Sequence, residues 1–268
     1  MKMKFFIPIL LSIFSNYTLI CQKGITIKYN IITSLHNIPL PRTAILSYKD
    51  GKSLFVYDQG NGMICVDRDG RTGDETMTYK TVNESNSGSL MIDCYMQDGM
   101  GNRYFTDYNN NHMYVREFIM FLPHIYTELS IPQIKWNISK EQKTIGNYVC
   151  IKASTKFRGR EYTAWFAPKL PAKIGPWKLT GLPGTILEAV DSQNLIYFKA
   201  ATINFTNNVQ LEQENTEKWK GEKISFEKAK TLPHELRKKL ASKYNSSMDR
   251  HSTPDINSIK LNTLEIYK

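Results

Sequence analysis

The sequence predicts a mainly β fold, a β-rich α+β domain whose antiparallel sheet is built from consecutive hairpins, followed by a C-terminal helix. Three observations predict it. Short strand-like runs recur almost to residue 205, turn residues separate them, and a long helical pattern comes only afterwards. Antiparallel sheets of this kind bury one apolar face. A half-open barrel is one arrangement that this order of elements allows.

Seven strand-like runs in the N-terminal half are bounded by turn residues. They are ITIKYNII (25–32), AILSY (44–48), SLFVY (53–57), MICVD (63–67), LMIDCYM (90–96), NRYFTDY (102–108) and MYVREFIMF (113–121). Asp50-Gly51, Asp69-Gly70 and Asp98-Gly99 lie between them, and Asp-Gly pairs favour tight turns. We therefore expect an antiparallel arrangement of short strands.

The stretch NYVCIKASTKFRGREYTAWFA predicts a hairpin with Arg158-Gly159 as its turn. This register pairs Ala153 with Ala164 on an apolar face. It pairs Lys152 with Trp165 on the other face, where a cation–π contact is expected. A slip of one residue would mix the two faces, so the pattern favours this register.

A second hairpin is predicted where DSQN separates TILEAV from LIYFKAATINF. Centring its turn on Ser192-Gln193 pairs Leu187 with Phe198 on an apolar face. The same register pairs Glu188 with Tyr197 on a mixed face, as expected of a sheet that is covered on one side.

The stretch GPWKLTGLPGTILEA, residues 175–189, carries two Gly/Pro turn signals before an apolar strand. Pro183 and Gly184 occupy the central positions of a type II turn, and Gly175-Pro176 fixes another bend. Gly181 and Gly184 would also let a ligand approach the backbone closely. We interpret the connector as a structural corner, with a ligand loop as the alternative.

The segment SFEKAKTLPHELRKKLASKY predicts a helix that packs on the sheet. Its apolar stripe recurs at every fourth residue, at Leu232, Leu236, Leu240 and Tyr244. Thr231 is a suitable N-cap, and Pro233 would then lie in the first turn. Residues 245–268 are predicted to be a polar tail with a late strand candidate, SIKLNTLEIY.

The N-terminus predicts export. Lys2 and Lys4 precede the apolar run Phe5–Phe14, which has the length of a signal-peptide hydrophobic region and is too short to span a bilayer. We expect cleavage between Cys21 and Gln22, which gives a signal peptide, 1–21, and a single domain, 22–268. Lipidation of Cys21 is disfavoured because the preceding isoleucine is bulky. The sequence thus predicts a protein of the periplasm or the outer-membrane periphery, not an integral membrane protein.

The net charge of +10 falls to +8 without the two lysines of the signal segment. A basic protein favours acidic partners such as phosphate, anionic lipid or an acidic protein face. Its basic residues are scattered, which is typical of a solvated surface and disfavours a nucleic-acid partner.

Three cysteines follow the signal segment: Cys65, Cys94 and Cys150. In an exported protein Cys65 and Cys94 are a candidate disulfide, and three buried free thiols are the alternative. The histidines stand in no metal-ligand spacing, and we find no nucleotide or nucleophile motif. Methionines near His112 are core filler or, alternatively, a soft copper site. The sequence predicts no metal, cofactor or catalytic set.

Several motifs, in order, resemble those of the GLPGLI family of exported proteins from Bacteroidota-type bacteria. They are Trp136-Asn137-Ile138 with Ile145–Ala153, the run Gly159–Phe166, and Pro171, Gly175–Lys178 and Gly181–Leu187. The match covers about residues 130–205 closely and the earlier half loosely, and it departs at an inserted Asn147 and at Thr185.

The resemblance implies a set of motif residues whose role is unassigned. They are Trp136, Cys150, Lys152, Ala153, Gly159, Arg160, Tyr162, Trp165, Gly175, Pro176, Gly181, Leu182, Pro183 and Gly184. It also implies an envelope protein encoded near TonB-dependent outer-membrane receptors, with no catalytic residues to carry over.

Three functions remain open. The first is a binding or accessory module for TonB-dependent transport, whose half-open sheet, closed by the helix, holds an apolar ligand. The second is a structural envelope component, which a flat apolar patch without a pocket would favour. The third is an enzyme with an unrecognised site, which a pocket with clustered ionisable groups would favour.

Overall fold

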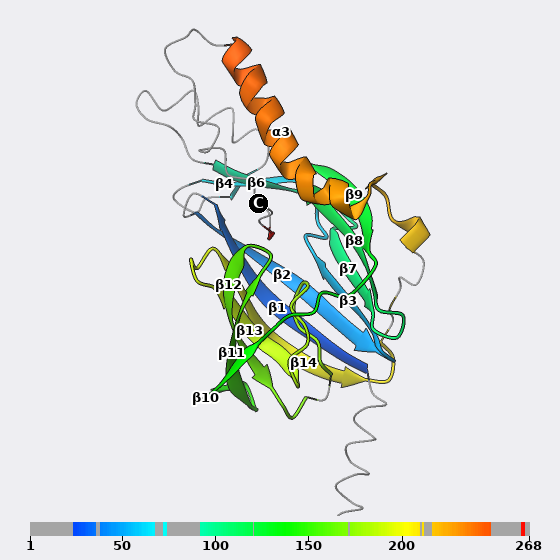
Figure 1. Cartoon of the computed structure of the whole chain (residues 1–268), viewed down its shortest axis with the longest axis vertical. Helices are drawn as coiled ribbons and strands as arrows, with labels where there is room; N and C mark the ends of the chain where they lie inside the picture. The colour runs from blue at the N-terminus through cyan, green and yellow to red at the C-terminus, as the bar shows by residue number, and fades with distance from the viewer. Residues whose placement is uncertain are drawn as a thin grey trace, which may run out of the picture.

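The computed structural model of the 268-residue chain confirms the mainly β fold with a C-terminal helix. It describes residues 24–35, 38–67, 72–73, 92–119, 121–170, 172–209, 211, 216–247 and 264–265. These residues form a twelve-stranded sheet, a three-stranded sheet and a long helix (Figure 1). The predicted signal peptide, 1–21, lies outside the described residues.

The twelve-stranded sheet has the order β10-β11-β12-β13-β14-β1-β2-β3-β7-β8-β9-β15. Its strands are β1 (Gly24–Leu35), β2 (Ile38–Lys49), β3 (Lys52–Tyr57), β7 (Asn102–Asp107), β8 (His112–Ile119), β9 (Leu122–Glu128), β10 (Asn137–Ile145), β11 (Tyr148–Phe157), β12 (Arg160–Ala167), β13 (Thr185–Asp191), β14 (Ile196–Thr206) and β15 (Glu222–Lys223). Neighbours pair antiparallel, except that β15 runs parallel to β9.

The remaining strands form a separate sheet of order β5-β4-β6. They are β4 (Asn61–Asp67), β5 (Thr72–Gly73) and β6 (Ile92–Asp98). The chain therefore leaves the large sheet after β3 and returns at β7, which pairs with β3. The β4–β6 register makes Cys65 and Cys94 direct Cα partners across the two strands. Their disulfide stays a prediction.

The predicted register of the β11–β12 hairpin is confirmed. Ala153 pairs with Ala164, and both are fully buried, so the apolar face points into the core. Arg158 and Gly159 both have positive φ, 49° and 77°, as a two-residue turn of the primed kind requires. The cation over Trp165 is Lys143, 4.4 Å from the ring centroid, rather than Lys152. Lys152 forms an ion pair with Glu141 instead, 3.0 Å.

The predicted register of the β13–β14 hairpin is wrong by two residues, because Ala189 pairs with Phe198. The cause is the turn. The Asp191 carboxylate accepts hydrogen bonds from the backbone N–H groups of Leu195 and Ile196, at 2.7 and 2.9 Å, and Asn194 has a φ of 55°. This longer turn moves the pairing by an even number of residues, so each side chain keeps its predicted face.

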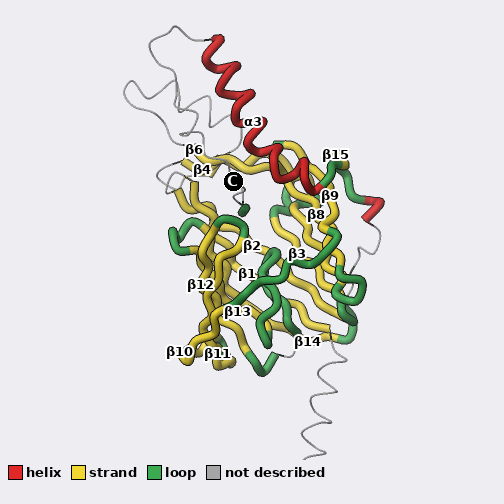
Figure 2. The backbone as a smooth tube through the Cα atoms, viewed as in Figure 1, coloured by secondary structure: helices red, strands yellow, loops and turns green. Residues whose placement is uncertain are grey.

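The large sheet curls strongly, so that strands far apart in its order approach each other (Figures 1 and 2). Arg158, in the β11–β12 turn, forms an ion pair of 2.5 Å with Glu128 at the end of β9. Buried aromatic residues fill the inside of the curl, with Phe55 at edge-to-face distance from both Tyr29 and Phe198, 6.2 Å between ring centroids in each case.

The helix α3 (Phe226–Ser247) begins where the predicted helical segment begins, but Thr231 is not its N-cap. Ser225 caps it, since its Oγ accepts a hydrogen bond from the backbone N–H of Lys228, 3.1 Å. Pro233 consequently lies inside the helix. The first turn packs on β9, where the Phe226 ring stacks on Tyr126 with 5.8 Å between centroids.

Candidate functional site

The connector between β12 and β13 is a corner, although its turn is not the predicted type II turn. The Gly184 N–H donates to the carbonyl of Leu182, 2.8 Å, which closes a three-residue turn around Pro183. The φ of Gly184 is +154°, far from the value of about 80° that a type II turn has at this position. A Cβ at Gly184 would lie 2.4 Å from the carbonyl oxygen of Ala167, so the strand passes too close for any side chain.

The connector and the β11–β12 hairpin bring the motif residues into one packed unit. Trp136 is half-buried and donates from Nε1 to the carbonyl of Thr180, 2.9 Å. Arg160 forms an ion pair of 2.9 Å with the buried Asp191. Cys150 is a free thiol with no exposed surface, and its burial raises its pKa to about 11. These contacts fit a structural role for the motif.

One residue of the connector carries a charge into the core. Lys178 has no exposed surface. Its Nζ donates to Glu128 Oε1 at 2.5 Å and to the hydroxyl of Tyr126 at 3.1 Å, and it forms an ion pair with Glu265. A buried ammonium is costly unless such partners surround it. These carboxylates hold the pKa of Lys178 above its ordinary value, against the opposing effect of burial.

Two tyrosines extend this group of side chains across the curl. The hydroxyls of Tyr104 and Tyr126 donate to the two carboxylate oxygens of Glu117, at 2.8 and 2.6 Å. Burial, followed by the nearby Glu117 charge, raises the pKa of both phenols well above the ordinary value. Both tyrosines therefore stay neutral hydrogen-bond donors at ordinary pH.

We call the set of five charged groups the Lys178 cluster. Its members are Lys178, Arg158, Glu117, Glu128 and Glu265. Three carboxylates face two cations, so the cluster has one negative charge in excess. Burial, followed by the charge of Glu117, raises the pKa of Glu265 to about 7 despite the opposing effects of Lys178 and Arg158. Glu265 is thus the carboxylate that the cluster accommodates least well.

Two buried polar atoms beside the cluster are without a hydrogen-bond partner among the described residues. They are the hydroxyl of Tyr162 and the Nε1 of Trp177, whose residues are 1% and 3% exposed. The two rings lie 6.3 Å apart. Glu265 and Asp191 are close enough to Tyr162 to add to the burial that raises its pKa. Orphaned donors of this kind in a core are uncommon and call for a cause.

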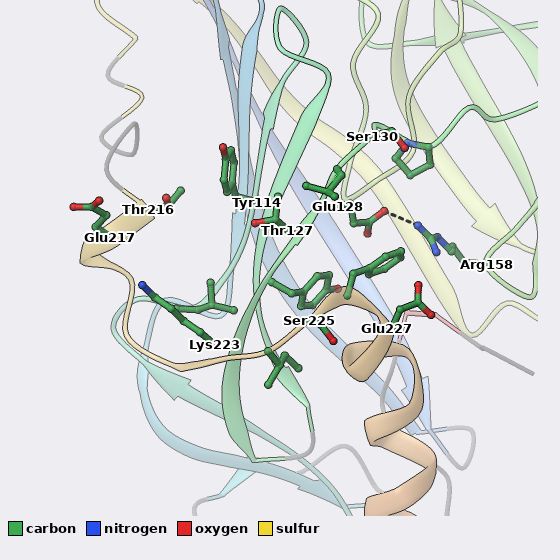
Figure 3. Close-up of a pocket in the computed structure, with 16 residues that line it drawn as sticks. Tyr114, Thr127, Glu128, Ser130, Arg158, Thr216, Glu217, Lys223, Ser225 and Glu227 are labelled. Atoms are coloured by element: carbon green, nitrogen blue, oxygen red, sulfur yellow. Dashed lines mark hydrogen bonds and ion pairs between the residues drawn. The ribbon is translucent and has the colours of Figure 1, made fainter.

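A pocket of about 740 Å³ opens beside the Lys178 cluster, between β9 and the start of α3. We call it the β9–α3 pocket. Figure 3 shows Glu128 and Arg158 pointing toward each other on one side of it, with Thr216, Glu217 and Lys223 at the other end. Its remaining lining is mainly apolar or uncharged: Tyr114, Ile125, Tyr126, Thr127, Leu129, Ser130, Pro132, Ile224, Ser225 and Phe226, together with Glu227.

The motif residues do not form this pocket: none of them is among the described residues that line it. Sequence reasoning missed Glu128, Arg158 and Glu265 as site residues and treated Lys178 only as part of a motif. The signal in the sequence was a lysine between two large apolar residues, Trp177 and Leu179, in a Gly/Pro-rich connector.

The described ranges contain no group of His, Cys, Asp or Glu side chains that could hold a metal ion. In the same part of the chain, α3 and the other helical segments lack the length or the apolar character that a membrane-spanning helix requires.

No family model matches the chain, and no curated protein matches it. Among solved structures, PNGF-II in a C2 crystal form has a TM-score of 0.50 and 14% identity, covering 80% of this chain and 33% of that chain. Its P21 form has a TM-score of 0.50 and 13% identity, covering 80% and 34%. A Vibrio parahaemolyticus domain described as an outer-membrane lipoprotein-sorting protein has a TM-score of 0.26 and 10% identity, covering 77% and 96%.

This chain therefore spans about a third of the length of PNGF-II. At such low identity the likeness to PNGF-II concerns the fold alone.

Proposed function

We propose that the protein is a non-catalytic ligand-binding module of the cell envelope, which holds an apolar ligand in the β9–α3 pocket. The observation that carries the proposal is the pocket itself, because its volume of about 740 Å³ is bounded mainly by apolar or uncharged side chains. The Glu128–Arg158 ion pair lies on one side of it, and Glu217, Lys223 and Glu227 also line it. Small-molecule sites typically combine a volume of about 300–1,000 Å³, an apolar lining and a few placed polar groups.

The envelope location rests on the sequence. Lys2, Lys4 and the apolar run Phe5–Phe14 form the pattern of an export signal. The GLPGLI resemblance supports an accessory role beside a TonB-dependent outer-membrane receptor. Fractionation of cells that produce the full chain tests the location: we expect a periplasmic product whose intact mass begins at Gln22. A cytoplasmic product that retains Met1 would contradict it.

An enzyme is the alternative that one feature favours, since ionisable residues line the pocket, with Glu128 and Arg158 side by side among them. The structure pairs these two charges with each other and pairs Glu128 also with Lys178. Glu128 is only 2% exposed, and a general acid or base must reach the substrate directly or through one water. The arrangement supports binding over proton transfer, and the presence of a pocket favours binding over a purely structural role.

A fluorescence titration with N-phenyl-1-naphthylamine, an uncharged apolar probe, tests the binding function. We expect saturable binding by the wild-type protein and a loss of about tenfold in affinity for Phe226→Ala, which removes a ring from the pocket wall. Phe205→Ala is the matched control, because Phe205 lies on β14, is 40% exposed and does not line the pocket. Absence of saturable binding, or equal affinities for the two variants, would contradict the proposal.

A further inference from the structure

Two residues near the C-terminal end occupy the inside of the curled sheet. Leu264 and Glu265 are each 8% exposed, and Leu264 belongs to the main hydrophobic core. In Figure 1 this short red piece lies within the curl, below the start of α3. They belong to the segment that the sequence predicts to be a polar tail.

The chemistry of this pair is that of a small amphiphile. An apolar side chain enters an aromatic core, and a carboxylate next to it meets the ammonium of Lys178. Lys178 also lies over the ring of Tyr126, 5.2 Å from its centroid, and over that of Tyr104, 5.8 Å. The carboxylate headgroup of an amphiphile would make the same contact with Lys178.

The fit of Glu265 to this place is imperfect. The Tyr162 hydroxyl and the Trp177 indole N–H, beside it, find no acceptor among the described residues. Buried hydrogen-bond donors usually have an acceptor. Leu264 and Glu265 therefore occupy the space but leave these two donors without a hydrogen bond within the described part of the chain.

The place that Glu265 fills adjoins the β9–α3 pocket. Tyr126, Glu128 and Arg158 line the pocket. Tyr126 and Glu128 are at the same time the hydrogen-bond partners of Lys178. A ligand lying in the pocket is therefore separated from Lys178 only by side chains that touch both.

We propose that the Lys178 cluster is a carboxylate-binding site that Leu264–Glu265 fills in this structure, and that its ligand is an amphiphile with a carboxylate headgroup and an apolar chain. The ligand binds by displacing Leu264–Glu265 from the core. This inference rests on the proposed function, because the apolar chain of the ligand lies in the β9–α3 pocket.

Several titratable and charged groups face Glu265, one or more from each element packed against it. They are Lys178 of the connector, Glu117 of β8, Tyr126 and Glu128 of β9, Arg158 of the β11–β12 turn and Tyr162 of β12. Lys178, whose ammonium meets the Glu265 carboxylate directly, would meet the headgroup of the ligand in the same way, so we expect a carboxylate to be preferred over a cationic headgroup.

Calorimetric titration of the full-length protein with decanoate and with decyltrimethylammonium tests the selectivity. The alkyl chains of the two probes differ by one methylene group, and their headgroups have opposite charge. We expect decanoate to bind at least tenfold more tightly and this preference to disappear in Lys178→Met. Equal affinities of the wild-type protein for the two probes would overturn the inference.

Displacement is tested by hydrogen exchange of the C-terminal peptide that contains Leu264 and Glu265. We expect saturating decanoate to speed exchange there. Leu264→Ala should bind decanoate about tenfold more tightly than wild type, because its competing segment is held less well. Leu122→Ala is the control, since Leu122 is 64% exposed and outside the pocket lining. Unchanged exchange, or no difference between these two variants, would overturn displacement.

The two proposals fail differently. Saturable binding of N-phenyl-1-naphthylamine without any preference for decanoate would leave the binding function standing and overturn the carboxylate site. If the wild-type protein does not bind N-phenyl-1-naphthylamine saturably, the proposed binding function itself is overturned.

Discussion

Gly184→Ala tests whether the corner before β13 is structural. An alanine Cβ would lie 2.4 Å from the carbonyl oxygen of Ala167, 2.8 Å from its carbonyl carbon and 2.9 Å from Cα of Pro168. All three atoms are backbone, so no side-chain rotation relieves the overlap. Overpacking of this kind costs about 1–3 kcal/mol, and the φ of +154° adds about 1 kcal/mol for a residue other than glycine.

Together these effects predict a loss of about 2–4 kcal/mol from the free energy of unfolding, a large share of the roughly 5–15 kcal/mol that is typical. At about 2–4 °C per kcal/mol for a chain of this size, the midpoint of thermal unfolding should fall by about 4–16 °C. Circular dichroism melting measures this shift.

Gly146→Ala is the matched control for this prediction. Gly146 has a φ of +57°, but a Cβ there would meet no atom within 4 Å, so only the backbone strain of about 1 kcal/mol applies. A melting point of Gly184→Ala that is no lower than that of Gly146→Ala would refute the reasoning. An unchanged melting point combined with lost binding of the apolar probe would instead favour the ligand loop.

Three further predictions follow from the buried groups. Lys178→Met leaves the carboxylates of Glu128 and Glu265 in the core without the ammonium group that pairs with them. The free energy of unfolding, measured by urea denaturation, should therefore fall by about 3–5 kcal/mol. A loss under about 1 kcal/mol would contradict a role of these buried ion pairs in stability. The pKa of Glu265, raised by burial from an ordinary 4.5 to about 7, means that docking of its segment takes up a proton. Docking of this segment is then strongest below pH 4.5 and weakens by on the order of 3 kcal/mol as the pH rises to 7. Hydrogen exchange of the C-terminal peptide, corrected for its intrinsic rate, should therefore become faster over that range. Glu265→Gln should abolish this pH dependence, and exchange that slows as the pH rises would refute the prediction. Burial gives the Cys150 thiol a pKa of about 11, so in the folded protein it should react with a thiol reagent about a hundredfold more slowly than glutathione does. In urea its rate should be comparable to that of glutathione. A fast reaction of the folded protein would show that the thiol is accessible.

The β11–β12 register could be predicted because a two-residue turn joins two strands that both alternate. Its two faces differ in polarity along their whole length, so only one register keeps Ala153 and Ala164 inside. The β13–β14 register could not be predicted in the same way. The Asp191 carboxylate accepts hydrogen bonds from two backbone N–H groups, and these bonds lengthen the turn. The alternation of apolar and polar residues in the flanking strands does not predict them.

Strand partners that lie far apart in the sequence were beyond prediction for a related reason. The runs at 63–67 and 90–96 alternate as well as their neighbours do, yet they form the separate three-stranded sheet. The pairing of β3 with β7 depends on which strands bury more surface together, and a local pattern carries no information about that comparison.

The candidate site depends on contacts of this long-range kind. The sequence marks the connector around Lys178 by its Gly/Pro turns, but Glu128 comes from β9 and Glu265 from near the chain end. Each is an ordinary surface-type residue when considered alone. Only the curl of the sheet, which brings the β11–β12 turn to β9, makes them neighbours of one buried ammonium.

The Lys178 cluster is better explained by binding than by stability. Desolvation of several buried charges offsets most of their mutual attraction, and well-packed apolar side chains of similar volume often stabilise a core as well or better. The curl already has such a core in Tyr29, Phe55 and Phe198, which pack without any charge. A charged group that the fold does not need, and that adjoins the β9–α3 pocket, has the properties of a site prepared for an outside partner. The double variant Lys178→Met/Glu265→Gln should therefore recover most of the stability that Lys178→Met loses, while the preference for decanoate stays absent; recovery of that preference would show that the headgroup binds elsewhere.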